Sequence, residues 1–276
     1  MLRSIKDMES FAIRATDGMI GHAMDFLFDD GKWVIRYLVV NTGTWLSGRG
    51  VLVSPIALGH PDWATKVLPL SITKARVKDS PDIDTKKPVS RQHEMSYISY
   101  YGYQDYWSGG ALWGDVSYPA LMMPAVAGLL SKPGDARSSA PRSAPRAATL
   151  RKGEDPHLRS SKVVLTYNVE ASDGDIGHVE DMLVDEETWA IRYIVVNTSN
   201  WWLGHQVLIA PQWIQDVRWS DATVSVNLTR QAVKDAPPYD PTALLDRDQE
   251  LGIHAHYGRS AYWVDEEKRE AGIAPH

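Results

Sequence analysis

The chain has no cysteine, and this excludes disulfides, thiolate nucleophiles and cysteine-ligated metals. Long apolar runs are missing as well. The longest one, near residues 120–130, is interrupted by Pro124 and is far shorter than the ~20 residues that cross a bilayer. The first seven residues lack the apolar core of a signal peptide. We therefore expect a cytoplasmic protein whose contact with a membrane is at most peripheral.

The recognisable motifs of common enzyme classes are also missing. The sequence contains no glycine-rich phosphate loop, no His-Glu-x-x-His pattern and no Gly-x-Ser-x-Gly elbow. No nucleophile stands at a recognisable spacing from a general base. We expect a non-enzymatic protein with no catalytic residues, no cofactor and no resident metal.

Positive charge is scarce in the second half of the chain. The net charge is −6, and it divides into 0 for residues 1–130, +5 for residues 131–162 and −11 for residues 163–276. An acidic surface repels the phosphate backbone of nucleic acids. Nucleic acid is therefore an unfavoured partner, although the basic segment 131–162 leaves an association with RNA open as an alternative.

What the sequence does contain is a long internal repeat. The stretch Trp33–Thr42 returns as Trp189–Thr198, and from Asp17 to Trp107 the chain aligns with itself without a gap at an offset of 156 residues. About a third of the aligned positions are identical. A repeat of this length indicates a duplicated domain, because solenoid repeats have periods of about 20–50 residues. The expected ranges are a first domain at 1–107, an apolar segment and flexible linker at 108–160, a second domain at 161–264 and a charged C-terminal segment at 265–276, which we expect to form a short exposed helix over residues 265–271.

Each copy is expected to contain several short strands. Trp33–Asn41 is dense in β-branched and aromatic residues and is apolar on both faces, which is typical of a strand buried on both sides. Asp-Gly dipeptides at 17–18 and 173–174 favour hairpin turns. Helical turns are expected to follow Thr73 and Thr229 as N-caps and to end before Pro81 and Pro237. The expected strands are Ser10–Arg14, Gly21–Asp29, Trp33–Asn41, Val51–Pro55 and Lys66–Ile72 in the first copy, and Val163–Thr166, Gly177–Asp185, Trp189–Asn197, Val207–Pro211 and Ala222–Leu228 in the second.

Four motifs occur in the same order in both copies: Asp-Gly-x-x-Gly-His, Ile-Arg-Tyr-x-Val-Val, Val-Leu-x-x-Pro and Val-Lys-Asp-x-Pro. Together they resemble the PRC-barrel domain, which is named for the cytoplasmic barrel of the photosynthetic reaction-centre H subunit. The resemblance covers about two thirds of the chain. It implies a mainly β fold of two tandem small PRC-type β-barrels with short helices and aromatic-rich tails, and we expect the two barrels to pack on each other.

The same resemblance implies a binding or assembly module that makes protein–protein contacts, without shared catalytic residues. Two alternatives stay open. One is an accessory on the cytoplasmic side of a photosynthetic reaction centre or another membrane electron-transfer complex. The other is a ribosome- or RNA-associated maturation factor.

The tail of each repeat is rich in aromatic residues, which suits a protein interface. The same side chains could instead cover the barrel of their own chain. The apolar segment at 118–130 likewise fits either a docking element or packing on its own barrel. The candidate partner-binding residues are Tyr101, Tyr106, Trp107, Tyr257, Tyr262 and Trp263.

Three pairs of polar residues are further candidates. His22 and His178 stand three residues before Asp25 and Asp181, but positions three apart on a strand face opposite sides, so we favour histidines bonded to the turn backbone over a metal site. Arg36 and Arg192 could bind a carboxylate or phosphate, but a pair with an acidic residue of the barrel, such as Asp25 or Asp181, is favoured.

His254 and His256 would share one face if the second tail were extended, which is a suitable spacing for metal ligands. The first repeat has Ile98 and Tyr100 at these positions, so a metal site there would be private to the second copy. We favour a surface aromatic tail.

Overall fold

A computed structural model describes residues 1–46, 48–81, 89–124, 157–198 and 205–264 of the chain. These residues form two β-sheets and a few short helices, so the expected mainly β class is confirmed. Within this part of the chain, no helix has both the length and the apolar character needed to span a membrane. The expected flexible linker (131–160, apart from its last few residues) and the expected C-terminal helix lie outside the described residues.

The chain folds into two compact units, and neither unit is continuous in the sequence. Unit 1 consists of residues 1–7, 161–185 and 191–276, whereas unit 2 consists of residues 8–160 and 186–190. Each unit is therefore built mainly on one repeat but includes a short segment of the other. The domain limits expected from the sequence stay predictions.

Unit 2 is built on the first repeat. Its helical elements cap or flank a sheet whose longest member is a strand of 12 residues. The elements are β2 (Ala12–Ala15), β3 (Gly18–Asp29), β4 (Val34–Asn41), β5 (Gly50–Val53), the 3₁₀-helix η1 (Pro55–Ala57), β6 (Val67–Pro69), α2 (Lys74–Lys78), α3 (Arg91–Tyr101), η2 (Pro119–Met122) and β7 (Leu158–Ser160).

Unit 1 is built on the second repeat and follows the same order with one added strand, β12. A short helix, α1 (Ile5–Met8), contains the boundary between the units at Asp7 and Met8. The other elements are β1 (Leu2–Ser4), α5 (Ser161–Val164), β8 (Asn168–Ala171), β9 (Gly174–Asp185), β10 (Ile191–Asn197), β11 (Gln206–Ile209), η3 (Pro211–Trp213), β12 (Ile214–Arg218), β13 (Thr223–Val226), α6 (Arg230–Lys234) and α7 (Arg247–His256).

The two sheets share one topology. The strand order is β5-β4-β3-β2-β6 in unit 2 and β11-β10-β9-β8-β13-β12 in unit 1. The pairs β2–β6 and β8–β13 are parallel, and the other pairs in these orders are antiparallel. Among the described strands no pairing joins the two ends of either order, so two open sheets are found, and the closed barrels expected from the sequence are not.

The central strands have the burial expected for them. From Val34 to Val40 every residue of β4 is buried, and from Ile191 to Val196 every residue of β10 is buried. Apolar residues therefore face away from water on both sides of each sheet. Arg36 and Arg192 are the charged residues within these strands, and their partners are described with the candidate site below.

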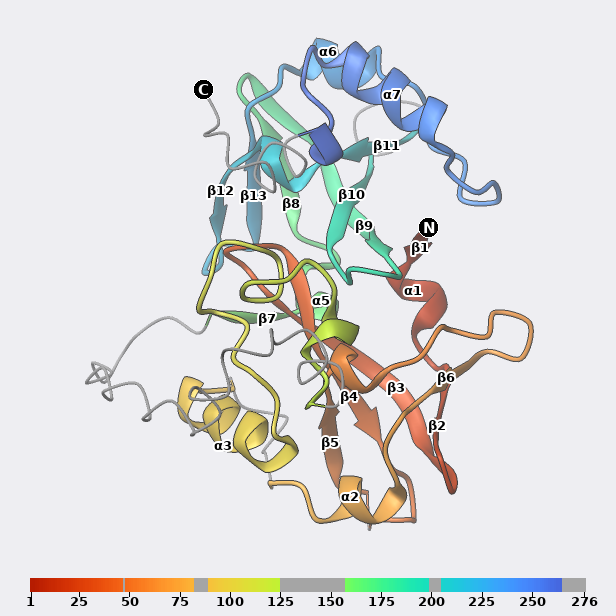
Figure 1. Cartoon of the computed structure of the whole chain (residues 1–276). Coiled ribbons are helices and arrows are strands. Elements are labelled where there is room, and N and C mark those ends of the chain that lie inside the picture. The colour runs from red at the N-terminus through yellow and green to blue at the C-terminus, as the bar shows by residue number, and fades with distance from the viewer. Residues whose placement is uncertain (47, 82–88, 125–156, 199–204, 265–276) are drawn as a thin grey trace. The chain divides into compact units, whose positions relative to one another are not determined.

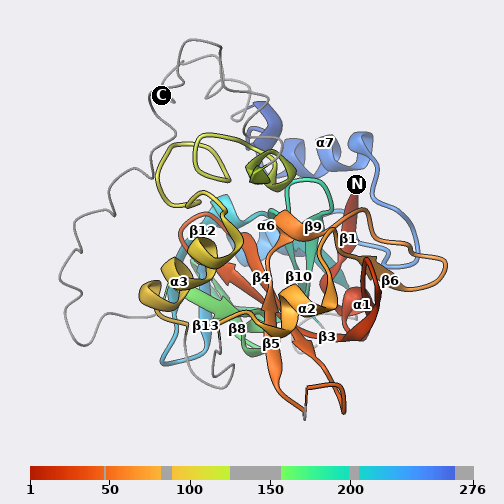
Figure 2. The same cartoon turned by 60° about the horizontal axis from the view of Figure 1, so that its bottom comes forward.

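Local sequence signals explain the hairpins and the short helices. Asp17 lies in the turn between β2 and β3, and its carboxylate accepts a hydrogen bond of 2.7 Å from the backbone N–H of Lys74, at the start of α2. Asp173 accepts the equivalent 2.7 Å bond from Arg230 at the start of α6. Thr73 and Thr229 cap these helices as expected. Helix α2 accordingly lies against β3 (Figure 2), and α6 lies against β9.

One expectation about secondary structure is wrong. Val163–Thr166 is not a strand, because α5 occupies its first half and Thr166 takes a φ of 93°. The aromatic tails, whose conformation the sequence left open, contain the helices α3 and α7. Helix α3 begins at the N-cap Ser90, and α7 begins at Asp246, which forms a capping box with Gln249.

The duplication extends to backbone conformations that L-residues rarely adopt. Among the residues that the structure describes, six non-glycine residues have positive φ angles, and they form three pairs at the repeat offset of 156 residues. Each such residue costs about 1–2 kcal/mol, so surrounding contacts must hold it. The pairs are Ser10 with Thr166, Trp33 with Trp189, and Lys66 with Ala222.

The strands β1 and β7 complete the sheet of the repeat to which they do not belong. Both have the sequence Leu-Arg-Ser. Strand β1 pairs with β9 from Leu2–Asp185 to Ser4–Leu183, and β7 pairs with β3 from Leu158–Asp29 to Ser160–Leu27. The two ladders have the same register at the repeat offset. In Figure 1 the exchange is visible as red β1 beside green β9, and green β7 beside orange β3.

The motif Gly-x-x-Gly-His contains a glycine that the fold requires. A Cβ atom on Gly21 would lie 2.0 Å from the carbonyl oxygen of Asn41, and one on Gly177 would lie 2.0 Å from that of Asn197. Both glycines also have positive φ, at 152° and 134°. The long strands can approach their neighbours this closely only because these positions have no side chain.

We predict that Gly21→Ala and Gly177→Ala each lower the free energy of unfolding by about 3 kcal/mol, because the new methyl group displaces backbone. Gly252→Ala is the matched control. Gly252 lies inside α7, and open space surrounds the position that a methyl group would take, so alanine should stabilise by about 0.5–1 kcal/mol. Urea unfolding of the three variants measures this. Equal effects at all three positions would contradict the close approach.

Candidate functional site

A buried arginine lies at the centre of each unit. In unit 2 the Arg36 guanidinium donates 2.8 Å and 3.2 Å hydrogen bonds to the Leu112 carbonyl and the Asp29 carboxylate. Its carbon lies 4.0 Å from the ring centroid of Tyr106 and 4.7 Å from that of Trp113. Arg36 pairs with an acidic residue of the sheet, as expected, but that residue is Asp29 and not Asp25. Arg36 and Asp29 stand seven residues apart on neighbouring strands, where the β3–β4 register brings them together.

A buried glutamate of α3 forms the second layer. The Tyr106 hydroxyl donates a short hydrogen bond to the carboxylate of Glu94. The same carboxylate lies 3.0 Å from a guanidinium nitrogen of Arg91 and 2.6 Å from Nε2 of His157. We call Arg36, Tyr106 and Glu94 the inner cluster of unit 2. It connects the sheet, the loop after α3 and the helix itself.

Unit 1 contains the same inner cluster at the repeat offset. The Arg192 guanidinium lies over the ring of Tyr262, with its carbon 4.1 Å from the centroid, and one of its nitrogens lies 3.6 Å from a carboxylate oxygen of Asp185. Arg192 also pairs with an acidic residue of the neighbouring strand, which is Asp185 and not Asp181. Glu250 accepts a 3.1 Å hydrogen bond from the Tyr193 hydroxyl and lies 3.3 Å from an Arg247 nitrogen.

The two inner clusters differ in their histidines. In unit 2, His157 directly precedes β7 in the sequence, and its ring contacts the Glu94 carboxylate. In unit 1, His254 of α7 lies 3.0 Å from the Tyr193 hydroxyl and is buried. His256 is exposed and its ring nitrogen lies 2.8 Å from the Ala232 carbonyl oxygen. Because α7 is a helix, His254 and His256 do not share a face, and the metal-ligand spacing expected for an extended tail is absent.

Burial governs the protonation of these groups. Burial raises the pKa of Tyr106 well above its ordinary value, and neighbouring Glu94 raises it further. The Glu250 carboxyl also has a raised pKa, because burial outweighs the attraction of Arg247 and the hydrogen bonds from Tyr262 and Tyr193. Phenols with such a pKa stay protonated near neutral pH and act as hydrogen-bond donors. The inner clusters are therefore suited to holding α3 and α7 on their sheets.

An arginine–tryptophan pair covers the outside of each inner cluster. The guanidinium carbon of Arg91 lies 4.1 Å from a ring centroid of Trp107, and that of Arg247 lies 4.0 Å from one of Trp263. We call these the outer pairs. Both tryptophans are half-buried, and the side chains of Arg91 and Arg247 are 26% and 56% exposed. Water and other molecules therefore reach each outer pair.

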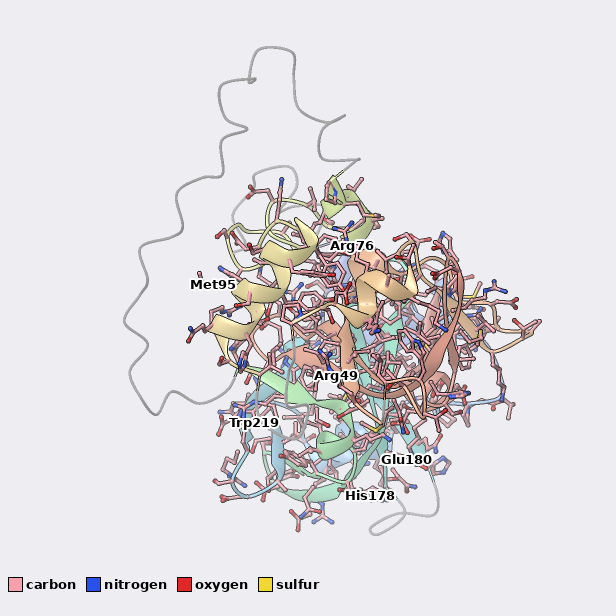
Figure 3. All side chains as sticks on the ribbon, turned by 90° about the horizontal axis from the view of Figure 1, so that it is seen from below. Arg49, Arg76, Met95, His178, Glu180 and Trp219 are labelled. Atoms are coloured by element: carbon pink, nitrogen blue, oxygen red, sulfur yellow. The ribbon has the colours of Figure 1, made fainter. Side chains whose placement is uncertain are left out.

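The other candidate partner-binding residues lie deeper. Tyr101 and Tyr106 are buried in unit 2, and Tyr262 is buried in unit 1. Tyr257 is half-buried, with its ring 4.9 Å from that of Trp213. Tyr101 also contributes its backbone carbonyl, which accepts a 3.1 Å hydrogen bond from Arg76 of α2 (labelled in Figure 3). Of the six candidates, Trp107, Trp263 and Tyr257 are therefore half-buried, and the other three are buried.

The shared spacing of His and Asp in the two repeats has a structural explanation. The Asp181 carboxylate accepts a 2.5 Å hydrogen bond from the Ser4 hydroxyl of β1, and Asp25 accepts a 2.6 Å bond from Ser160 of β7. Burial raises the pKa of Asp181. Both aspartates therefore hold an exchanged strand.

The histidines of this motif do not share that role. His22 is exposed, and His178, labelled beside Glu180 on β9 in Figure 3, is half-buried. In the described part of the chain, neither the His22 nor the His178 side chain has a hydrogen bond, so the expected bond to the turn backbone is wrong. Nowhere among the described residues does a group of three or more His, Asp or Glu side chains come together that could hold a metal ion.

The described part of the apolar segment packs on its own unit. Pro119 and Met122 of η2 are buried, and η2 lies against η1. The Ser71 hydroxyl lies 3.8 Å from the sulfur of Met123. This favours the intramolecular alternative for residues 118–124, while residues 125–130 lie outside the described residues.

Comparison with known proteins gives no relative: no family model matches the chain, and no curated protein matches it.

Sequence reasoning missed the acidic centre of the site. Glu94 and Glu250 are identical at the repeat offset, as are Arg91 and Arg247 three residues before them. A buried ion pair is stable only when its hydrogen bonds are satisfied. Opposite charges three residues apart that are identical in both repeats and lie near aromatic positions can therefore indicate such a pair in the sequence.

We predict that Glu250→Gln changes how stability depends on pH. A carboxyl with a raised pKa in the folded state contributes stability below its unfolded pKa, and this is lost as pH rises through the folded pKa. Relative to wild type, the glutamine variant should therefore become more stable as pH increases from 4.5 to 7.5. Thermal melts at both pH values measure this, with the exposed Asp248→Asn as a control for loss of one charge on α7. A stability difference that is independent of pH would refute the prediction.

Proposed function

We propose that this protein is a non-enzymatic binding and assembly module of two PRC-barrel-type units, and that its outer pairs contact a protein partner. The observation that carries the proposal is the recurrence of the outer pairs. Arg91–Trp107 and Arg247–Trp263 stack at 4.1 Å and 4.0 Å on two units that differ in many other surface residues.

The chemistry of an outer pair suits protein recognition. Tryptophan and arginine are enriched among the residues that dominate binding energy in protein interfaces. One guanidinium nitrogen of Arg91 faces Glu94, and one of Arg247 faces Glu250. The stacked indole fixes the plane of each guanidinium, and its other N–H groups can donate to a carboxylate of a partner. The expected partner surface therefore carries an acidic side chain beside an apolar one.

The inner clusters support a non-enzymatic role for the same region. Arg36 and Glu94 are each engaged by several groups of their own unit, at distances from 2.6 to 3.2 Å. Groups committed in this way stabilise the fold and are poorly placed to bind a substrate.

The proposal includes the cytoplasmic location expected from the sequence.

The motif order supports the PRC-barrel assignment within this proposal. The Gly-x-x-Gly-His motif supplies the glycine of the close approach to Asn41, and the Ile-Arg-Tyr motif supplies Arg36 of the inner cluster. These two motifs thus have equivalent physical roles in both units, where Gly177 and Arg192 occupy the same positions.

The test is capture of partners from native lysate by the tagged chain and by its Trp107→Ala/Trp263→Ala variant. Removing an interface residue of this class costs about 2 kcal/mol or more, so the variant should retain less than about a tenth of the captured partner. Trp45→Ala is the matched control, because Trp45 is also half-buried and stacks with a cation, Lys74, at 4.8 Å.

Equal capture by all three proteins would contradict the role of the outer pairs. Substrate turnover that survives purification and depends on one side chain of the inner cluster would contradict the non-enzymatic assignment.

A further inference from the structure

Two sites in this chain bind the same tripeptide. Leu-Arg-Ser at 2–4 lies on β9 and Leu-Arg-Ser at 158–160 lies on β3, in equivalent registers. The leucine pairs with Asp185 in one site and Asp29 in the other, and it is buried in both. The serine donates its hydroxyl to Asp181 or Asp25. The edge of each long strand is therefore a receptor for an extended Leu-x-Ser segment.

The unit 1 site holds its segment by more than the ladder. The Asp181 carboxylate also accepts a 3.2 Å hydrogen bond from the backbone N–H of Lys6. Leu2 and Ile5 insert apolar side chains that are 8% and 0% exposed. Within the segment, the Ser4 hydroxyl also accepts a 3.1 Å bond from the backbone N–H of Asp7. Apart from Asp181, all these groups come from residues 1–7, which belong to unit 1.

The contacts that hold residues 1–7 in this site do not depend on how the segment is joined to the rest of the chain. Residue 8 belongs to unit 2, so the chain passes from one unit to the other between Asp7 and Met8. The hydrogen bonds that Ser4, Lys6 and Asp7 make in this site all lie on the unit 1 side of that boundary. The same bonds can form whichever molecule carries the unit 2 to which the segment is joined.

We propose that residues 1–7 of one copy of this chain occupy the β9 edge of a second copy, so that two copies assemble by reciprocal strand exchange. Exchange of an identical element needs no new interface, because the contacts within and between molecules are the same. The proposal is independent of the outer pairs, since it uses β1, β9 and Asp181 only.

Competition with the chain's own segment sets the concentration at which exchange occurs. A segment tethered by a short connection has an effective concentration on the order of millimolar. The exchanged dimer should therefore increase with protein concentration during refolding, and should be trapped afterwards by the burial of Leu2 and Ile5.

Because the chain has no cysteine, disulfide trapping reports the pairing directly. Arg3 and Val184 are Cα partners in the β1–β9 ladder. Neighbouring antiparallel residues lie about 4.5–5.5 Å apart, within the range that a disulfide spans. A copy with Arg3→Cys and a differently tagged copy with Val184→Cys are mixed, unfolded, refolded at concentrations up to about 1 mM and oxidised. A second mixture replaces Val184→Cys by Asp175→Cys, an exposed position on the same strand.

A cross-linked heterodimer that appears in the first mixture, grows with concentration and is absent from the second would support the proposal. The double variant Arg3→Cys/Val184→Cys on one chain serves as the internal control and should close a disulfide within the monomer at low concentration. If it does so while the first mixture yields no heterodimer even at about 1 mM, strand exchange between copies is refuted. If the double variant does not close, the β1–β9 pairing itself is refuted and the proposal with it.

Discussion

The fold of this chain depends on two short antiparallel ladders, each of which joins the first strand of one repeat to the long strand of the other. A serine hydroxyl of each exchanged strand bonds to a half-buried aspartate, at 2.5 Å for Ser4 and 2.6 Å for Ser160. Each carboxylate also accepts the backbone N–H of the residue that follows it, Phe26 or Met182. The serine hydroxyl adds a charge-assisted bond from the exchanged strand, which contributes about 1.5–3 kcal/mol. Because the units are completed in this way, a cut through the chain at the repeat boundary would leave each unit without a strand.

A second constraint is the buried arginine of each central strand. Arg36 occupies a position flanked by apolar residues. Asp29 neutralises its charge, and its guanidinium stacks on the ring of Tyr106. Tyr106 in turn holds Glu94 and therefore helix α3. The buried arginine of the sheet is thus linked through Tyr106 to helix α3, and Trp107 of the outer pair follows Tyr106 directly in the sequence.

The sequence was informative where a pattern acts locally. The alternation in Trp33–Asn41, the Asp-Gly turns and the threonine caps all predict elements that the structure contains. Prediction failed where distant groups decide the outcome. The partner of Arg36 depends on the β3–β4 register, and a register shift between Leu27 and Phe28 places Asp29 there. The helix α7 in the second tail was not predicted, although the Asp246–Gln249 capping box that begins it is present in the sequence. The exchanged strands also had a signal, because Leu-Arg-Ser recurs at the offset of 156 residues, but three residues do not reveal which strand they pair with.

The most direct test of this account is the measurement of nuclear Overhauser contacts across the two ladders in solution. The account predicts contacts between backbone protons of Arg3 and Val184 and between those of Arg159 and Phe28, as the registers require. Contacts between Arg3 and Phe28 instead, which would place each first strand on its own repeat, would contradict the exchanged architecture on which the rest of the account depends.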